Sequence, residues 1–286
     1  MGVLLKKEIG AQELAMAKKS SSQLSVQKKI RSWVKQGFAN SAAIIVFLLL
    51  WEIAPRVGWV EQTFIAPPSV ALATIGKWLV KGTLIKHVGV SLSRALLGFI
   101  LAMMVGIPLG FLLGGWYRTF ERIVTPVLRL MGEVNPFALF PVFILLFGIG
   151  EVSKISMIFW VCLWPILFNT VTGVKNVDPL LIKSAHSMGV RQNALFFKVI
   201  LPSAAPNIFH GVKMSSGLAF FMLIAAEMIG ASSGLGWLVW NAQNNYQIPD
   251  LFGATMVISV LGLSINQLFA WAERRLLAWK QSTTAW

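Results

Sequence analysis

Cysteine and histidine are scarce in this sequence. It contains one cysteine, Cys162, and three histidines, at positions 87, 186 and 210. A single cysteine excludes a disulfide framework and any metal site built from several thiolates. The histidines show none of the close spacings by which His ligands share a metal ion, so the sequence predicts no metal centre.

The motifs of ATP hydrolysis are missing. There is no Gly-x4-Gly-Lys-[Ser/Thr] phosphate loop, since the Gly76-Lys77 pair is followed by Trp78. The zinc-protease pattern HExxH and the dinucleotide fingerprint are absent as well. We therefore expect a chain that is not an enzyme, and any use of ATP requires another polypeptide to bind it.

Charged residues are few and hydrophobic residues dominate. They make up 13 % and 56 % of the 286 positions, and the mean hydropathy is +0.70. About 20 apolar residues in a helix cross a bilayer. The chain is predicted to be an all-α polytopic membrane protein with about six transmembrane helices, the third interrupted by polar residues and prolines. The predicted spans are 38–55, 89–115, 124–149, 153–173, 207–230 and 251–272.

The 25 basic residues outnumber the 11 acidic ones, and their distribution indicates a membrane topology rather than nucleic-acid binding. Lys and Arg are frequent before the first span, in the 174–206 link and after the last span, whereas the 231–250 link has none. Basic loops stay on the cytoplasmic side, so both termini are predicted to be cytoplasmic. The expected divisions are a basic N-terminal segment 1–36, a transmembrane domain 37–273 and a cytoplasmic tail 274–286.

A basic, partly amphipathic insertion, 178–202, separates the fourth and fifth spans. Asp178 is a favourable N-cap, and Gly189 stands where a helix C′ residue with positive φ is expected. A second short helix is predicted over 191–200, because Pro202 should block its continuation. Two short helices joined at a glycine indicate an element that contacts another protein in the cytoplasm.

Polar residues inside spans often mark a transport path. Arg94 begins the second span, Glu133 and Asn135 precede Pro136 in the third, and Glu227 lies late in the fifth. A proline at membrane depth frees a carbonyl that protein or a water-filled cavity must satisfy. One interpretation is that all five residues line a translocation pathway. The other is packing, with each group satisfied by a Glu–Arg pair or by the backbone.

Three glycines of the second span, Gly106, Gly110 and Gly114, repeat at four-residue intervals. Small residues at this spacing let helix backbones approach closely. We predict close packing there, and the spacing leaves open whether the neighbouring helix belongs to the same chain.

The insertion resembles the EAA motif of ATP-binding-cassette (ABC) importer permeases. The family pattern Glu-Ala-Ala-x3-Gly-x9-Ile-x-Leu-Pro is matched by Ala185-x3-Gly189-x9-Val199-x-Leu201-Pro202. Lys183 and Ser184 replace the Glu and the first Ala, so the family's contact through that Glu is not carried over. Further motifs, in the same order, are similar to the nitrate, bicarbonate, taurine and aliphatic-sulfonate subgroup: Pro67-Pro68-Ser69, Ser91-Leu92-x-Arg94, Gly106-x-Pro108-x-Gly110, Phe147-Gly148-x-Gly150, Ala226-Glu227-Met228-x-Gly230 and Gly234-Leu235-Gly236.

The resemblance implies a type I importer permease fold with a cytoplasmic coupling helix, located in the bacterial inner membrane. It implies a homodimer, two ATPase subunits that bind ATP and Mg, a periplasmic or lipid-anchored substrate-binding protein, and no cofactor in this chain. The residues that would dock the ATPase are Lys183, Ser184, Ala185, His186, Ser187, Met188, Gly189 and Val190.

The solute implied is a small oxyanion such as nitrate, bicarbonate, taurine or an alkanesulfonate. A pyrimidine, a thiamine precursor or riboflavin is the alternative within the family. An ATP-independent channel or secondary transporter is the alternative of another class. It predicts internal repeats and ionisable relays within spans, and the sequence shows no convincing repeat.

Overall fold

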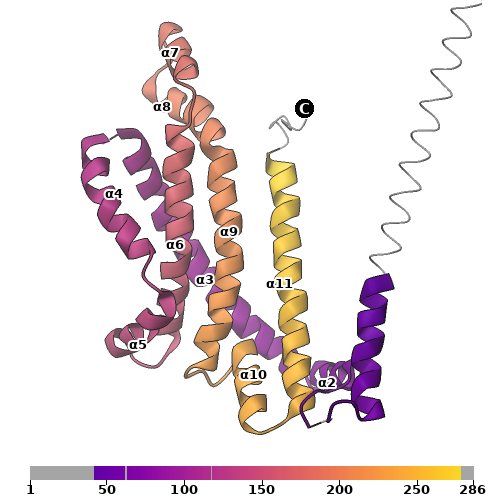
Figure 1. The fold of residues 1–286 in the computed structure, drawn as a ribbon. Coiled ribbons are helices and arrows are strands. Elements are labelled where there is room, and N and C mark those ends of the chain that lie inside the picture. The colour runs from indigo at the N-terminus through magenta and orange to yellow at the C-terminus, as the bar shows by residue number, and fades with distance from the viewer. Residues whose placement is uncertain (1–41, 62, 117, 278–286) are drawn as a thin grey trace, which may run out of the picture. The chain divides into compact units, whose positions relative to one another are not determined.

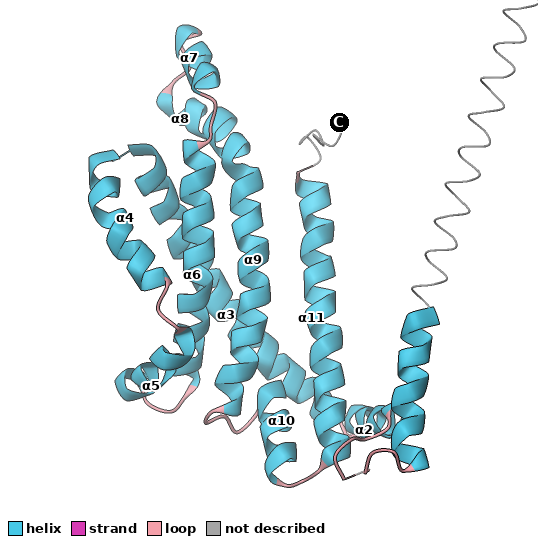
Figure 2. Cartoon of the chain, in the orientation of Figure 1, coloured by secondary structure: helices cyan, strands magenta, loops and turns pink. Residues whose placement is uncertain are grey.

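In the described residues of the computed structural model, helices are the only regular secondary structure, and loops and turns join them (Figure 2). These are residues 42–61, 63–116 and 118–277. The chain divides into two compact units, Met1–Ser69 and Val70–Trp286.

The described part of the first unit is a helix over residues 42–57 and the turn that follows it. Ser69 donates from Oγ to Glu52 Oε1 at 2.7 Å and from its backbone N–H to Glu52 Oε2 at 3.0 Å. These two bonds fasten the end of the turn to the helix. The first predicted span, 38–55, begins outside the described residues.

The second unit contains the other helices, and Figure 1 labels the α-helices among them. Along the chain they are α2 (Pro68–Val80, which starts just before the unit boundary), α3 (Thr83–Phe111), the π turn η1 (Leu112–Trp116), α4 (Arg118–Gly132), α5 (Pro136–Phe147), α6 (Glu151–Lys175), α7 (Pro179–Ser187), α8 (Gln192–Leu195), the π turn η2 (Phe196–Ile200), α9 (Leu201–Met228), α10 (Leu235–Asn244) and α11 (Ile248–Leu276).

Four continuous helices in the described residues are long and apolar enough to cross a membrane. A fifth crossing exists if α4 and α5 form one span, bent by 92° at the residues between them. The bend confirms that the third predicted span is interrupted. The four continuous candidates are Thr83–Gly115, Glu151–Lys175, Gln192–Met228 and Ile248–Leu276.

α3 and α6 pack with their backbones close together. A Cβ placed on Gly110 would lie 2.5 Å from Thr170 Cβ, and one on Gly114 would lie 2.9 Å from Val174 Cβ. A Cβ placed on Gly106 would lie 3.1 Å from Cγ2 of Ile166, which is also on α6. The predicted close packing is confirmed, and the neighbouring helix belongs to the same chain.

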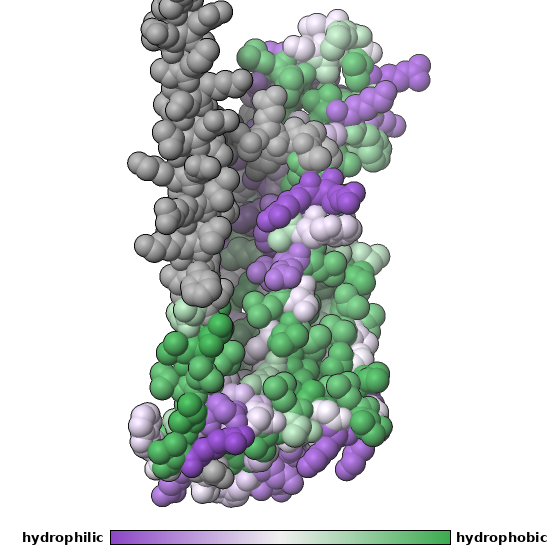
Figure 3. Space-filling model, turned by 90° about the vertical axis from the view of Figure 1, so that its right-hand side faces the viewer, coloured by the Kyte–Doolittle hydropathy of each residue, from purple (hydrophilic) through white to green (hydrophobic). Residues whose placement is uncertain are grey.

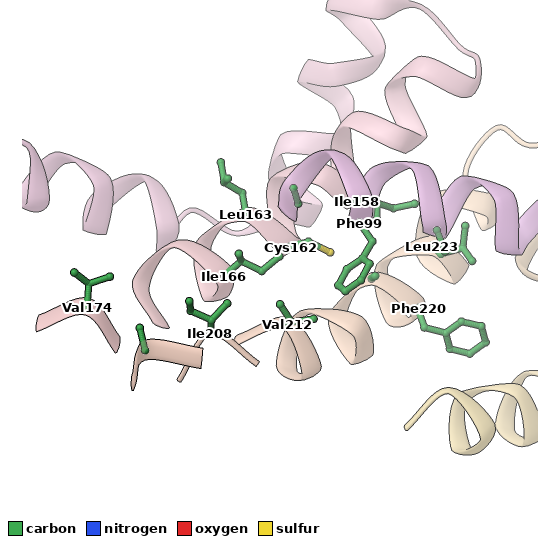
Figure 4. Close-up of a cluster of buried hydrophobic side chains, with 14 residues drawn as sticks. Phe99, Ile158, Cys162, Leu163, Ile166, Val174, Ile208, Val212, Phe220 and Leu223 are labelled. Atoms are coloured by element: carbon green, nitrogen blue, oxygen red, sulfur yellow. The ribbon is translucent and has the colours of Figure 1, made fainter. Parts of the chain in front are cut away.

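α9 also packs on α6 and completes the core. Gly211 of α9 lies against α6 so closely that a Cβ there would be 2.7 Å from the carbonyl oxygen of Pro165. Figure 4 shows Phe99, Ile166 and Val212, from α3, α6 and α9, within one buried apolar cluster. Arg94 and Glu227, two of the predicted site residues, lie on α3 and α9 of this core.

α11 is little covered by the other described residues. Only 11 % of its most apolar window is buried, and Val260, Leu263 and Leu268 are among its exposed side chains. Figure 3 shows hydrophobic residues (green) gathered on this face, with hydrophilic residues (purple) above and below them. An apolar surface of this kind suits lipid or another membrane helix.

The helix predicted to end before Pro202 does not end there. Gln192–Met228 is one continuous helix, and Pro202 occupies the first turn of α9, directly after η2. A π turn already departs from the i→i−4 hydrogen-bond pattern, so the missing N–H of proline interrupts little. The prediction of a separate helix over 191–200 is wrong.

Candidate docking and translocation sites

The ends of α7 are set by local sequence. Asp178 Oδ1 accepts a backbone N–H of the first turn at 2.8 Å. At the other end Gly189 has φ +71°, its N–H donates to the carbonyl of His186 (3.0 Å), and the N–H of Val190 donates to that of Ala185 (3.1 Å). These are the two bonds of a Schellman motif. The predicted N-cap and the positive-φ glycine are confirmed.

α7 presents large apolar side chains without cover. Met188 is 75 % exposed and Leu180 is 68 % exposed, although both lie outside the membrane-span candidates. Sequence reasoning missed Leu180 and its neighbour Leu181, which precede the EAA pattern; apolar residues in a short helix outside the spans were the available signal. Of the residues predicted to dock an ATPase, Ala185 is buried, Val190 is half-buried, and the others are exposed: Lys183, Ser184, His186, Ser187, Met188 and Gly189.

The break between α4 and α5 is a capped helix start. Asn135 Oδ1 accepts the N–H of Phe137 at 2.9 Å, and Pro136 is the first residue of α5. Proline loses no intrahelical bond at this position. Glu133 and Asn135 are exposed and Pro136 is half-buried, so the break presents polar groups at the surface of the chain.

A cavity with both polar and apolar side chains in its lining lies beside this break, between α4 and the end of α6. Its volume is about 600 Å³. α4 contributes polar residues at four-residue intervals, namely Glu121, Thr125, Arg129 and Glu133, and the end of α6 contributes Thr172, Lys175 and Asn176. Glu121 and Lys175 form an ion pair across the cavity.

Arg94 lies in a different place, in a buried network with two carboxylates. Its Nε and Nη2 donate to the two oxygens of Glu151 at 2.5 and 2.6 Å. Its Nη1 donates to Glu227 Oε1 at 2.8 Å and to the Ser233 carbonyl at 2.7 Å. Arg94 is 3 % exposed and Glu227 is fully buried, so each group depends on the other for compensation of its charge.

Groups from two elements, α3 and α10, donate hydrogen bonds to the carboxylate of Glu227. Ser91 Oγ donates to it at 2.8 Å and the N–H of Gly236 donates at 2.9 Å. Ser91 Oγ also accepts the N–H of Leu235 at 2.8 Å. The network therefore ties α3 and α9 to the first residues of α10.

Glycine is required in the segment that closes over this carboxylate. Gly234 has φ +125°, and a Cβ on it would collide with the carboxylate of Glu227. A Cβ on Gly236 would lie 2.8 Å from Glu227 Cβ. Residues 230–234 also fit Gly-x-Ser-x-Gly by letter, but that nucleophile motif needs a strand-to-helix turn, and this segment joins two helices.

The five residues predicted to line a pathway thus fall into two groups. Glu133, Asn135 and Pro136 mark the exposed α4–α5 break, whereas Arg94 and Glu227 belong to the buried network. For the second group the geometry favours the packing interpretation, since both charges are enclosed and hydrogen-bonded.

Sequence reasoning missed the remaining members of the network. Glu151 and the buried Lys154 are 3.7 Å apart at the start of α6. His87 Nδ1 accepts the N–H of Gly234 at 3.0 Å and its ring stacks on Trp237. The sequence did contain a signal for this network. Three motifs of the family resemblance meet in it, namely Ser91-Leu92-x-Arg94, Ala226-Glu227 and Gly234-Leu235-Gly236.

Residues 106–278 match the family described as "Binding-protein-dependent transport system inner membrane component". The putative aliphatic sulfonates transport permease protein SsuC of Bacillus subtilis is 34 % identical over 89 % of this chain and 91 % of its own length. The taurine transport system permease protein TauC of Escherichia coli is 30 % identical over 86 % and 90 %. The nitrate import permease protein NrtB of Leptolyngbya laminosa is 30 % identical over 67 % and 68 %.

Among solved structures, the chain is similar in fold to the inward-facing MetNI methionine ABC transporter. The TM-score is 0.57 at 18 % identity, and the match covers 65 % of this chain and 92 % of that one. An amino acid ABC transporter gives the same TM-score at 15 % identity. At these identities the likeness shows the fold alone.

Proposed function

This chain belongs to the binding-protein-dependent inner membrane components of ABC importers, and from that premise we propose that two copies of it form the pathway for a small oxyanion, an alkanesulfonate in particular. It is the multi-pass, non-catalytic permease subunit, and ATP is bound by partner ATPase subunits. The sulfonate class is supported by relatives named for sulfonates, which align over more of the chain than the nitrate relative does.

The exposed apolar face of α7 is the observation that carries the docking proposal. Leu180 and Leu181 on α7 and Met188 at its C-cap are exposed, and caps fix both ends of the helix. Burying such side chains in a cleft of a partner removes apolar area from water. We assign this face to the ATPase subunit, with Lys183, Ser184, His186, Ser187 and Gly189 beside it and with Ala185 and Val190 holding α7 in place.

A continuous helix leads from beside this face to the other end of the unit. The helix that begins at Gln192, just after α7, continues without interruption to Met228. Glu227, in its last turn, is bonded to α3 and to the start of α10. Movement of α7 when ATPase subunits close on ATP would therefore reach the Arg94–Glu227 network through one continuous helix, which suits an alternating-access mechanism.

The α4–α5 break and the cavity next to it are the proposed pathway lining. Asn135 and Glu133 are exposed beside a backbone break, and such breaks at membrane depth face protein or water. The cavity carries Arg129 and Lys175 as well as Glu121 and Glu133, so a passing anion would meet donors while the acidic groups remain paired or near solvent. The axis of a homodimer at this surface would complete the pathway.

The proposed orientation follows the charges. α7 and both termini lie in the cytoplasm, and α10 lies outside, where the substrate-binding protein arrives. The basic insertion and the absence of Lys and Arg from residues 231–250 support it.

Replacing Gly189 by Val tests the docking proposal. A side chain in the left-handed region costs about 1–2 kcal/mol, and a β-branched one is strongly disfavoured there. No atom lies within 4 Å of a Cβ at this position, so the effect acts on the turn alone. We expect normal insertion of the permease, loss of co-purifying ATPase and loss of uptake.

Gly189→Asn is the matched control, because asparagine is the other residue accepted at C′. It should keep both the ATPase and uptake. If Gly189→Val retained both, the turn would not position a docking surface, and the proposal would have to be abandoned.

A further inference from the structure

The turn between α10 and α11 has the hydrogen bonds of a Schellman motif but no glycine. The N–H of Gln247 donates to the carbonyl of Ala242 at 2.8 Å, and the N–H of Tyr246 donates to that of Gln243 at 3.2 Å. Tyr246 therefore occupies the C′ position, with φ +54°, and it is the one non-glycine residue with positive φ among the described residues. A bulky residue in this region is a genuine outlier.

The chain itself shows what this motif ordinarily uses. The turn after α7 has the same two hydrogen bonds and places Gly189 at C′ with φ +71°. Tyrosine at the equivalent position of α10 is not explained by packing, because Tyr246 is 86 % exposed. The backbone strain at Tyr246 is not offset by packing of its side chain, and uncompensated strain of this kind indicates a function for that side chain.

The surroundings of Tyr246 have the composition of a protein-recognition surface. Gln243 through Gln247 are all exposed. Trp240, which lies on α10 six residues before Tyr246, is 47 % exposed. Residues 241–247 hold five amide side chains and no charge. Tyrosine and tryptophan are enriched where proteins bind one another, and amides supply adaptable hydrogen bonds beside them.

We propose that Tyr246, with Trp240 and the exposed amides around it, is the anchor on which the external substrate-binding protein docks. The inference rests on the proposed function, in which α10 faces outward and a binding protein delivers the solute. α10 follows the span that begins at Gln192, just after α7, and so lies one span length away from the ATPase-docking face. Its first residues are fixed by the Arg94–Glu227 network, so a protein bound at Tyr246 would press on an element coupled to α9.

Tyr246→Gly separates docking from folding. Glycine relieves the strain at C′, so a purely structural residue would be improved by the change, and the variant should be at least as thermostable as the wild type. A docking anchor would be lost. We expect the concentration of binding protein that gives half-maximal ATPase stimulation to rise about tenfold, as for loss of an interface anchor, with the basal rate unchanged.

The assay uses the full permease–ATPase complex in nanodiscs and the importer's own purified binding protein, loaded with an alkanesulfonate. Tyr246→Phe keeps the aromatic ring and should stay within about twofold of wild type, since the ring supplies most of the contact area. Wild-type stimulation of Tyr246→Gly would overturn the proposal. Absence of stimulation in the wild type would instead count against the proposed function.

A photoreactive p-benzoylphenylalanine at position 246 distinguishes the other occupant, the lipid interface, where tyrosine is also common. Crosslinking to the added binding protein supports docking. Crosslinking to lipid alone, with the binding protein present, would make Tyr246 a membrane anchor and overturn the proposal.

Discussion

Arg94 holds two carboxylates at once, and the two differ in exposure. Glu227 is fully buried, whereas the side chain of Glu151 is 56 % exposed. Removing one member of a buried ion pair is strongly destabilising, because it leaves the other charge without compensation. The Arg94–Glu227 pair therefore fixes α3 and α9 relative to each other near the start of α10.

Arg94→Leu should consequently lower the free energy of unfolding by about 3–5 kcal/mol. The double variant Arg94→Leu/Glu227→Leu leaves no buried charge in the pair and should be more stable than Arg94→Leu alone. Denaturation of the purified permease in detergent, followed by circular dichroism, measures both. If the single variant had wild-type stability and had only lost uptake, the residues would act in the pathway.

The sequence identified Arg94 and Glu227 as polar residues within spans, but it could not choose between pathway and packing. The choice depends on partners that are 133 positions apart in the chain, and on backbone donors such as the N–H of Gly236. No local pattern encodes which carboxylate an arginine reaches. The glycines that allow the approach were visible, but only the tertiary structure gives the reason for them.

Helix α5 begins at a break that its own sequence specifies. Asn135 caps the helix and Pro136 follows at N1, which is the order that helix starts favour. The bend of 92° is the consequence for the element as a whole. Its polar residues are exposed in the single chain, which is why we assign them to a water-filled pathway.

Three substitutions at Asn135 test this assignment. Leucine removes both the cap, at a cost of about 1 kcal/mol, and the hydration of the pathway, so uptake should fall well below any loss of expression. Serine keeps a cap and a polar surface and should retain uptake. Aspartate also caps but repels an anion, so it should reduce uptake of an alkanesulfonate while ATPase co-purification stays normal. Wild-type transport by Asn135→Leu would leave the break as a packing feature.

The glycine repeat of α3 shows how far an element can be predicted. The four-residue spacing of the glycines predicted the close helix packing correctly, because this spacing is a property of one helix surface. It could not give the partner, since the matching ridge of α6, with Ile166, Thr170 and Val174, has no distinctive sequence. The same limit applied at Pro202, where a preceding π turn makes proline acceptable inside a helix.

On the scale of the whole molecule, one helix links the two proposed docking ends. It runs from Gln192, next to α7, to Met228, and the network at its far end holds α10. A binding protein at α10 and an ATPase at α7 would thus act on the same rigid element. Reciprocal coupling between two such sites requires an element whose position both of them bias.

This arrangement requires the two ends to lie on opposite sides of the membrane, which introduced cysteines can test. Ser184 and Asn244 are exposed, one on α7 and the other at the end of α10. The chain offers a clean background, because its single cysteine, Cys162, is fully buried. An impermeant thiol reagent should label Asn244→Cys in intact cells and Ser184→Cys only after permeabilisation.

Both docking proposals, the ATPase at α7 and the binding protein at Tyr246, require this labelling pattern. A cytoplasmic ATPase can reach α7 only if Ser184→Cys is protected in intact cells, and an external binding protein can reach Tyr246 only if Asn244→Cys is labelled. The lack of Lys and Arg in residues 231–250 is the charge pattern of a translocated loop. Labelling of Ser184→Cys with Asn244→Cys protected would reverse the orientation, and it would remove the docking face and the Tyr246 anchor together.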